Sequence, residues 1–224
     1  WSTTHLWPVT TIAERLRAEK GGAFGVVSTV PFSHATPAAF VSHNVSRGNV
    51  YTGRGGYEGL GIADEMVNLT KPDVVIGAGH PLWDNPEFSR KKGYISKDVY
   101  ETLKNSDEYV FVERQKGIDG GKALADGAER AVAEGKKLFG LFGGELNCFD
   151  PSIPSDSPGE PKVEQGSREN PSLAEASLAA IKVLQNNKNG FFLMCEAGDV
   201  DWANHSNDYA LMIGAMNNLH DAVQ

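Results

Sequence analysis

The chain has 224 residues, of which 40% are hydrophobic and 22% are charged, an ordinary composition for a globular protein. The formal net charge of −8 argues against a nucleic-acid backbone or an anionic membrane as the main partner, although a bound divalent cation would still admit phosphate ligands. No apolar run reaches the roughly 20 residues that a membrane-spanning helix needs.

Short apolar runs alternate with helical patterns along the chain, which predicts βαβ crossovers and a mostly parallel sheet sandwiched by helices. The expected strands, in chain order, are 23–30, 73–77, 109–112, 137–142 and 190–194. The expected helices are 12–20, 61–68, 97–105, 122–134, a segment that begins at 170–171, and the last segment, 209–223. We therefore predict a single α/β domain over residues 1–224.

Local signals mark several of these boundaries. Residues 11–14 have the spacing of a capping box, and Gly21 is placed to end the helix that follows them. Pro171 is expected at the first position of its helix. Residues 143–170 are rich in Pro, Ser, Gly and acidic side chains, which predicts a long surface excursion. The apolar stripe of residues 209–223 is expected to belong to the core.

The two cysteines, Cys148 and Cys195, are compatible with a disulfide, but Cys195 lies in an apolar predicted strand, which favours a buried free thiol. Cysteine usage therefore leaves the compartment open. The chain starts at Trp1 without a signal-peptide pattern and ends at Gln224 within a helical pattern. We expect it to be a portion of a longer protein, truncated at both ends.

The segment after the predicted strand 190–194 carries the strongest chemical signal. Glu196 follows this strand at its carboxyl end, where open α/β sheets place their sites. Asp201 and His205 are four residues apart, so a helix that begins near Asp201 would hold both on one face, about 5–6 Å apart at Cβ. Such a pair can ligate one Zn²⁺, although a solvated ion pair is the commoner outcome of this spacing.

A second cluster follows the predicted strand 23–30. Taken alone, Thr36 and Pro37 have the pattern of an N-cap followed by Pro at the first helical position, and His34 and Arg47 have the pattern of a loop histidine and a solvated charge. However, His34 and Thr36 lie just past the carboxyl end of a strand, as Glu196 does, so these side chains can converge. The forked guanidinium of Arg47 suits a phosphate oxyanion.

These two blocks, from His34 through Arg47 and from Gly190 through His205, together resemble the alkaline phosphatase family in order and internal spacing. The resemblance implies that Thr36 and Glu196 are ligands of a third metal site, usually Mg²⁺. It implies that Asp201 and His205 are two ligands of a catalytic Zn²⁺, and that Arg47 clamps the substrate phosphate. His34 would lie near the third metal, and because an imidazole suits Zn²⁺ better than Mg²⁺, the identity of that metal stays open.

The same resemblance implies a phosphomonoester hydrolase with two Zn²⁺ and one Mg²⁺ whose serine nucleophile lies outside this chain. A metal-bridging Asp would also precede residue 1, and further Asp and His ligands would follow residue 224. Neither Ser2 nor Ser33 has the preceding Asp of the family pattern, and His80 is a spare ligand candidate, although a loop histidine is the favoured interpretation. The isolated chain is therefore expected to be inactive. The resemblance implies a periplasmic or secreted enzyme that binds phosphomonoesters and inorganic phosphate, and a homodimer is its expected assembly.

Two other interpretations stay open. Related phosphodiesterases, sulfatases and phosphomutases share the metal scaffold, although the pairing of Thr36 with Glu196 favours a phosphomonoesterase. A non-catalytic metal-binding module is the second alternative. It draws on the sequon-like runs 44–46, 68–70 and 204–206, which would suit a glycosylated extracellular protein. Arg47 discriminates a phosphatase from the metal-binding module, because a purely structural metal site does not need this arginine.

Overall fold

The structure is a computed structural model that describes residues 9–54, 59–81, 93–144, 147–149, 152–154, 163–165 and 167–224. Within these residues, parallel strands form a five-stranded sheet in the order β3-β4-β2-β1-β7. The strands of this sheet are β1 (Ala23–Pro31), β2 (Val74–Ala78), β3 (Tyr109–Glu113), β4 (Lys137–Leu141) and β7 (Phe191–Glu196). The predicted parallel sheet is therefore confirmed, with every strand end within two residues of its expected place.

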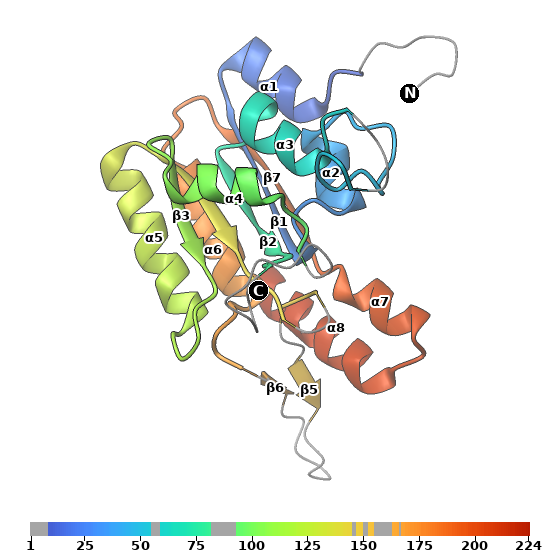
Figure 1. The fold of residues 1–224 in the computed structure, drawn as a ribbon. Coiled ribbons are helices and arrows are strands. Elements are labelled where there is room, and N and C mark those ends of the chain that lie inside the picture. Colours follow the sequence, from blue (N-terminus) through green and yellow to red (C-terminus); the bar gives the residue numbers. More distant parts are fainter. Residues whose placement is uncertain are drawn as a thin grey trace.

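Helices cover both faces of the sheet in a three-layer α/β fold (Figure 1). The helices on the first face are α1 (Ile12–Lys20), α2 (Ala35–Val41), α3 (Ile62–Glu65) and α4 (Lys97–Lys104). The helices on the second face are α5 (Gly120–Glu134) and α6 (Leu173–Leu184). The chain ends with α7 (Asp199–His205) and α8 (Tyr209–Val223), and α8 lies against α6 and the antiparallel pair β5 (Ser152–Pro154) and β6 (Val163–Gln165).

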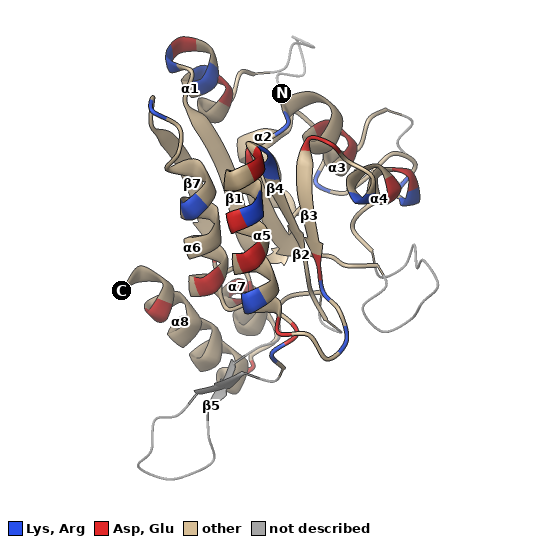
Figure 2. Ribbon diagram, turned by 90° about the vertical axis from the view of Figure 1, so that its left-hand side faces the viewer, with Lys and Arg blue, Asp and Glu red and all other residues tan. Residues whose placement is uncertain are grey.

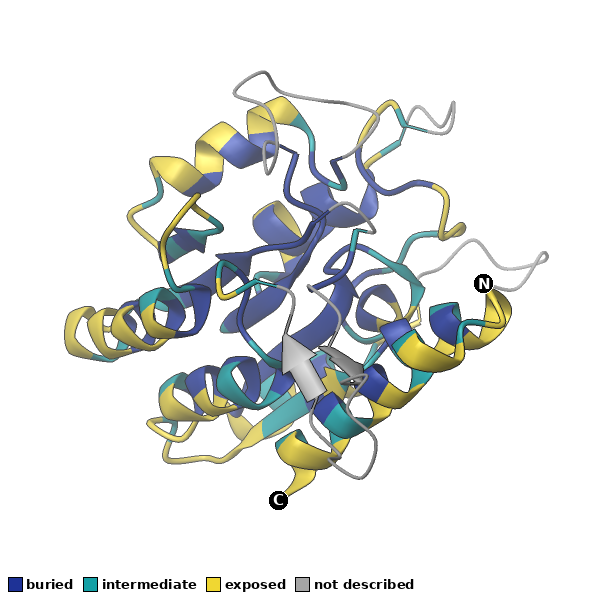
Figure 3. Ribbon diagram, turned by 90° about the horizontal axis from the view of Figure 1, so that it is seen from below, coloured by how far each residue is buried: buried dark blue, intermediate teal, exposed yellow. Residues whose placement is uncertain are grey.

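The core consists of two apolar layers, one on each face of the sheet. Successive side chains of a strand point to opposite faces, so Phe24 and Val26 of β1 pack toward α1–α4 whereas Ala23 and Val27 pack toward α5 and α6. Every residue of β1 is buried, which explains why most of its sequence is apolar. Figure 3 shows the buried sheet between helices whose outer faces are exposed, and Figure 2 shows that charged residues gather on the outer faces of α1, α4 and α5.

Two capping boxes set the starts of α1 and α6. At α1, the predicted box is confirmed, because Thr11 Oγ1 accepts from the Glu14 amide at 3.2 Å and Glu14 Oε2 accepts from the Thr11 amide at 2.9 Å. At α6, the expected start was wrong: the helix begins at Leu173, and Pro171 precedes its N-cap, Ser172. The reason is a second capping box between Ser172 and Glu175, which satisfies two amides that no helical carbonyl can reach.

The helical pattern predicted for residues 61–68 forms two joined pieces. The helix α3 continues without a break into a π-helical turn, η1 (Met66–Thr70). The chain leaves this turn at Lys71, whose φ of 45° lies in the left-handed region, and Pro72 then prevents further helix. The predicted helix is therefore confirmed in place and ends two residues later than expected.

The interpretation of residues 190–194 as a buried strand was half right. The strand β7 is parallel to β1, but among the described residues it lies at the edge of the sheet, and Phe191 is 39% exposed. Cys195 is exposed as well, so the expected burial of its thiol was wrong, although neither Cys148 nor Cys195 forms a disulfide. An apolar run specifies a strand but not its place in the order of strands, and that order decides its burial.

The apolar stripe of α8 was also misassigned. Tyr209, Ile213 and Met216 are 74%, 51% and 47% exposed, so most of the stripe that we expected in the core faces outward, although Leu219 packs against the core. The buried side of the helix is instead formed by small and polar residues, with Gly214 and Ala215 among them. Small side chains let α8 approach its neighbours closely, and helical spacing alone did not indicate which face would pack.

Both ends of the predicted excursion 143–170 are held at the carboxyl edge of the sheet. The Gly143 amide donates to Asn170 Oδ1 at 2.8 Å, and Arg114 Nη1 donates to the Gly143 carbonyl at 2.6 Å. Arg114 Nη2 also lies 2.8 Å from Glu169 Oε2. Nearly half of the excursion lies outside the described residues. Of the helices that the structure describes, none combines the length and the apolar character needed to cross a bilayer.

Candidate metal and phosphate site

The predicted site residues gather where the strand order reverses. The chain passes from β1 to β2 on one side, whereas β7 pairs with β1 on the other side. A crevice at such a reversal, outside the carboxyl ends of the strands, is the usual ligand site of an open α/β sheet. Glu196 is the last residue of β7, and His34, just past the end of β1, is the N-cap of α2.

His34 and Arg47 are in direct contact. Arg47 Nη2 lies 3.0 Å from His34 Nε2, although the two residues are 13 positions apart. Burial and then the positive charge of Arg47 lower the pKa of His34, whereas Glu196 and Asp201 act to raise it. The lowered pKa favours a neutral imidazole, whose Nε2 can accept the hydrogen bond that Arg47 donates. The opposing effects also indicate that all four side chains share one electrostatic environment.

Two aromatic rings enclose the imidazole of His34. Its centroid is 5.5 Å from that of Trp202 and 6.3 Å from that of Tyr94, both in edge-to-face orientation. Arg54 lies over the ring of Tyr94, with its guanidinium carbon 4.7 Å from the ring centroid. The sequence analysis did not identify Tyr94, Trp202 or Arg54. Trp202 directly follows Asp201 and could have been found by its position in the motif.

Glu196 and the start of α7 are bound to β1. Ser28 Oγ donates to Glu196 Oε2 at 2.7 Å, and Thr29 Oγ1 donates to Asp199 Oδ1 at 2.5 Å. Burial raises the pKa of Asp199, and the hydrogen bond from Thr29 only partly offsets this effect. The sequence analysis missed Ser28, Thr29 and Asp199, because a hydroxyl within an apolar strand gives no local signal for a partner far along the chain.

Asp201 and His205 lie on one face of α7, as predicted from their spacing. His205 Nε2 is 3.6 Å from Asp201 Oδ1, and the two side chains are 72% and 79% exposed. The helix begins at Asp199, two residues before the expected start. The pair is therefore placed to ligate one cation from its open side, and a solvated ion pair has the same geometry.

Thr36 is the second residue of α2 and is exposed. The expected N-cap role of Thr36 was wrong, because His34 is the N-cap and Pro37 is the third residue of the helix. Pro is tolerated there because the first amides of a helix have no helical partner. The Thr36 hydroxyl thus lies two residues past His34, after the carboxyl end of β1.

No set of three or more His, Cys, Asp or Glu side chains within the described residues is arranged to enclose a metal ion. The donors do have suitable chemistry. A hydroxyl and a carboxylate, Thr36 and Glu196, are oxygen ligands of the kind that Mg²⁺ binds, and the mixed pair Asp201 and His205 suits Zn²⁺. The described donors are thus candidate ligands near a guanidinium and do not form a closed metal centre.

His80 belongs to a separate cluster at the carboxyl ends of β2 and β3. It is 3% exposed, and its Nε2 lies 2.9 Å from Glu113 Oε2. Tyr100 donates to the same carboxylate oxygen at 2.6 Å. Burial opposes ionisation of Glu113, but the bonds from His80 and Tyr100 outweigh it and lower the pKa of this carboxyl. His80 is therefore engaged within the fold, as expected for a loop histidine rather than a spare ligand.

Comparisons with known proteins agree over nearly the whole chain. A family model described as alkaline phosphatase matches residues 3–224. The chain is 33% identical over 213 residues to alkaline phosphatase 3 of Bacillus subtilis (strain 168), which covers 92% of this chain and 36% of that relative. It is 27% identical over 241 residues to the tissue-nonspecific alkaline phosphatase isozyme of Gallus gallus, covering 100% of this chain and 41% of that relative.

Solved structures give the same result for the fold. The crystal structure of Thermus thermophilus alkaline phosphatase superposes with a TM-score of 0.64 at 25% identity, over 93% of this chain and 36% of that one. A mutant of the TAB5 alkaline phosphatase with Mg bound in its M3 site superposes with a TM-score of 0.61 at 24% identity, over 96% and 49%. The chain thus spans less than half the length of each of these relatives.

Proposed function

Because this chain belongs to the alkaline phosphatase family, we propose that it forms the central part of the catalytic domain of a metal-dependent phosphomonoesterase. The complete enzyme would hydrolyse phosphomonoesters to an alcohol and inorganic phosphate, using a serine nucleophile that this chain does not contain. By itself the chain would bind part of the metal cluster and would not turn over substrate. A periplasmic or secreted location and a homodimeric assembly are part of this proposal on family grounds alone.

The observation that carries the proposal is the contact between Arg47 and His34 beside Glu196 and Asp201. A solvated surface arginine has no reason to lie against a histidine that shares its environment with two carboxylates. The contact uses Nη2, so the other N–H groups of the guanidinium remain available to a ligand. A planar donor held in this way matches the equatorial oxygens of a phosphoryl group and would stabilise the negative charge that they carry.

The chain's own donors would hold the cations on either side of this arginine. Thr36 and Glu196 would bind Mg²⁺, with His34 near that site, and Asp201 with His205 would bind Zn²⁺. When bound, such cations supply Lewis-acid stabilisation of the attacking and leaving oxygens and lower the pKa of a bound hydroxyl or water. Arg47 would orient the phosphoryl group, and the aromatic rings of Tyr94 and Trp202 would restrict the movement of His34 and therefore of Arg47.

The test is hydrolysis of p-nitrophenyl phosphate by the full-length protein carrying this sequence, comparing Arg47→Ala and Arg47→Lys with the parent. We expect Arg47→Ala to lower kcat/KM by about 100-fold, a typical loss for one transition-state donor. Lys should restore only part of it, since a point charge lacks the fork. The matched control is Arg15→Ala, because it removes an exposed arginine and its ion pair on α1, outside the candidate site. Unchanged hydrolysis and phosphate inhibition in both Arg47 variants would refute the phosphate-clamp role.

The same preparation separates this function from its rivals. A phosphomonoesterase should prefer p-nitrophenyl phosphate to bis-p-nitrophenyl phosphate and p-nitrophenyl sulfate, whereas a diesterase or sulfatase of the superfamily should show the reverse preference. A structural metal-binding module should bind Zn²⁺ with no dependence on inorganic phosphate or on Arg47. Phosphate that tightens metal binding only when Arg47 is present supports the phosphatase.

A further inference from the structure

Two adjacent hydroxyl side chains interrupt the apolar run of β1. Ser28 and Thr29 are both 0% exposed, and each is hydrogen-bonded to a carboxylate that lies about 170 residues further along the chain. Buried hydroxyls cost free energy unless they are bonded, and an apolar β-branched residue would suit this strand better. Their presence in a wholly buried strand therefore calls for a role in holding those carboxylates.

Ser28 fixes one oxygen of Glu196. The two residues are directly paired in the register of β1 and β7, so their side chains emerge on the same face of the sheet. Ser28 Oγ donates to Glu196 Oε2 at 2.7 Å and accepts from the Val30 amide at 3.2 Å. The Val30 amide occupies a lone pair of the hydroxyl, which leaves its hydrogen directed at the carboxylate. This bond holds Glu196 in one orientation, and the other carboxylate oxygen, Oε1, takes no part in it.

Thr29 fixes the first residue of α7. Its Oγ1 donates to Asp199 Oδ1 at 2.5 Å and lies 3.4 Å from the Asp199 amide, which donates to it. Gly198 lets the turn lie close against β1, because a Cβ at this position would lie only 2.6 Å from Val30 Cγ2. The start of α7 is thus bonded and packed against the strand, and this helix carries both Asp201 and His205.

We propose that Ser28 and Thr29 are positioning residues that serve the two cation sites separately, Ser28 through Glu196 and Thr29 through the α7 helix. This inference rests on the proposed function. Partners that bind the free oxygen or backbone of a ligand orient it, and removing such a partner typically lowers metal affinity by about 10- to 100-fold. Since the two hydroxyls contact different ligand-bearing segments, their removal should affect different metals.

The experiment measures Mg²⁺ and Zn²⁺ dissociation constants for the full-length protein carrying this sequence by dialysis against buffered metal and elemental analysis. We expect Ser28→Ala to weaken Mg²⁺ binding by about 10-fold or more while Zn²⁺ affinity stays within about twofold. Thr29→Val, which keeps the shape of the side chain and removes the hydroxyl, should weaken Zn²⁺ binding more than Mg²⁺ binding. Neither readout depends on catalytic turnover.

Ser33→Ala is the matched control. Ser33 is also 0% exposed and follows β1, but its hydroxyl donates to the Tyr94 carbonyl at 2.7 Å instead of a carboxylate. Its loss should reduce thermal stability without a selective effect on either metal. If Thr29→Val does not fold, the pair Thr29→Ser and Thr29→Ala replaces it, because both remove the methyl group and only Ala removes the hydroxyl.

The outcomes separate this inference from the function on which it rests. Wild-type protein that binds neither metal contradicts the proposed function. Wild-type protein that binds both metals, together with Ser28→Ala and Thr29→Ser/Ala variants that bind them with unchanged affinity, overturns the positioning role and leaves the phosphatase intact. An equal loss of both metals in every variant, Ser33→Ala included, also overturns it, because that pattern reports a general loss of structure.

Discussion

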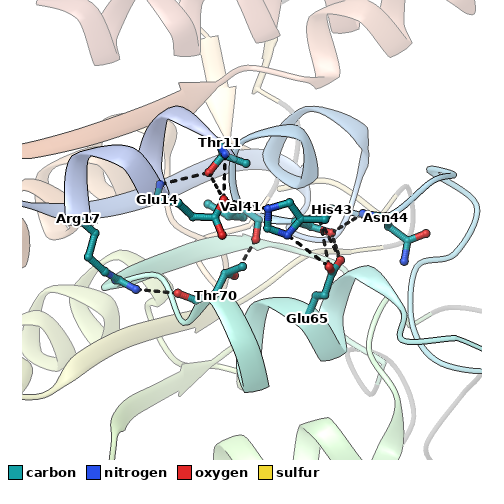
Figure 4. A network of polar contacts seen from close by, with 9 residues as sticks. Thr11, Glu14, Arg17, Val41, His43, Asn44, Glu65 and Thr70 are labelled. Atoms are coloured by element: carbon teal, nitrogen blue, oxygen red, sulfur yellow. Dashed lines mark hydrogen bonds and ion pairs between the residues drawn. The ribbon is translucent and has the colours of Figure 1, made fainter. Parts of the chain in front are cut away.

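His43 Nε2 lies 2.8 Å from Glu14 Oε2, so a histidine that follows α2 contacts the carboxylate that caps α1 (Figure 4). The other nitrogen of the ring, Nδ1, is 3.5 Å from Glu65 Oε1, and Glu65 also accepts bonds from the Ser42 hydroxyl and the His43 amide. One imidazole thus joins three helices of the first face. These helices include α2, the element that carries Thr36, so the network supports one side of the candidate site.

We expect this network to stabilise the fold in a pH-dependent manner. Burial opposes ionisation of Glu14, but bonds from the Thr11 amide and His43 outweigh it and lower the pKa of this carboxyl in the folded state. A lowered folded pKa contributes stability that is fully present above the ordinary carboxyl pKa and is lost as pH falls through the lowered value. Glu14→Gln should therefore cost about 1 kcal/mol at neutral pH and much less at about pH 3.

Urea unfolding of the parent and Glu14→Gln at both pH values measures this difference. Glu19→Gln is the control, because Glu19 lies on the same helix and pairs only with Arg15 in an exposed ion pair. A destabilisation of the same size at both pH values would show that the carboxylate charge is irrelevant. The bonds would then act only as neutral helix caps.

The ion pair of Arg114 and Glu169 should stabilise the fold more than the exposed ion pair of the neighbouring Arg168. Arg114 is 10% exposed at its side chain and bonds both Glu169 and the Gly143 carbonyl, so Arg114→Ala removes a donor from a buried carbonyl and from a partly exposed carboxylate. We expect a loss of about 2 kcal/mol in the free energy of unfolding, below the usual cost of breaking a fully buried pair because Glu169 is 24% exposed. Arg168→Ala, at a site 56% exposed, should cost under about 1 kcal/mol. Equal costs in denaturant titrations would refute the difference.

The sequence was sufficient to predict the parallel sheet, which the structure confirms. The two motif blocks were sufficient to indicate the family, which the comparisons confirm. Both succeeded because their signals are local: an apolar run specifies a strand, and a four-residue spacing specifies one helix face. Where burial depends on the order of strands or the docking of helices, local signals failed. Phe191 and Tyr209 are as apolar as core residues, yet both are exposed.

The supporting residues of the site were invisible for the same reason. Ser28 and Glu196 are 168 positions apart, and Arg47 and Tyr94 reach His34 from separate loops. Each contact exists only because the strand order places β1 between β2 and β7 and brings the loops that follow these strands together. A motif therefore indicates which side chains can do chemistry, whereas the fold decides which others hold them in place.

Gly198 should resist substitution for a steric reason. Its φ of −69° is open to any residue, but an alanine Cβ would lie 2.6 and 2.9 Å from the two methyl carbons of Val30. We expect Gly198→Ala to cost about 1–3 kcal/mol, as overpacking does, and to displace the start of α7. Gly48→Ala is the control, since the nearest atom to its added Cβ would be 3.5 Å away.

A double-mutant cycle with Val30→Ala tests the cause of that cost. If the clash is responsible, removing the valine methyls should make Gly198→Ala cheaper by about 1 kcal/mol or more, measured as a coupling free energy in urea unfolding. Additive costs would place the strain elsewhere in the turn. The glycine would then be needed for a reason other than the close approach to β1.

The 224-residue polypeptide by itself carries only part of the proposed metal site. Asp201 and His205 form an open pair, 72% and 79% exposed, and two ligands bind Zn²⁺ far more weakly than the three or four of a complete site. We expect weak Zn²⁺ binding that His205→Ala abolishes and His220→Ala, at an exposed histidine of α8, leaves unchanged. We expect no hydrolysis of p-nitrophenyl phosphate, because the proposed function places the nucleophile and the remaining ligands outside these residues. Turnover by rigorously purified chain that disappears with Arg47→Ala would contradict this expectation, since it would require a nucleophile among these residues.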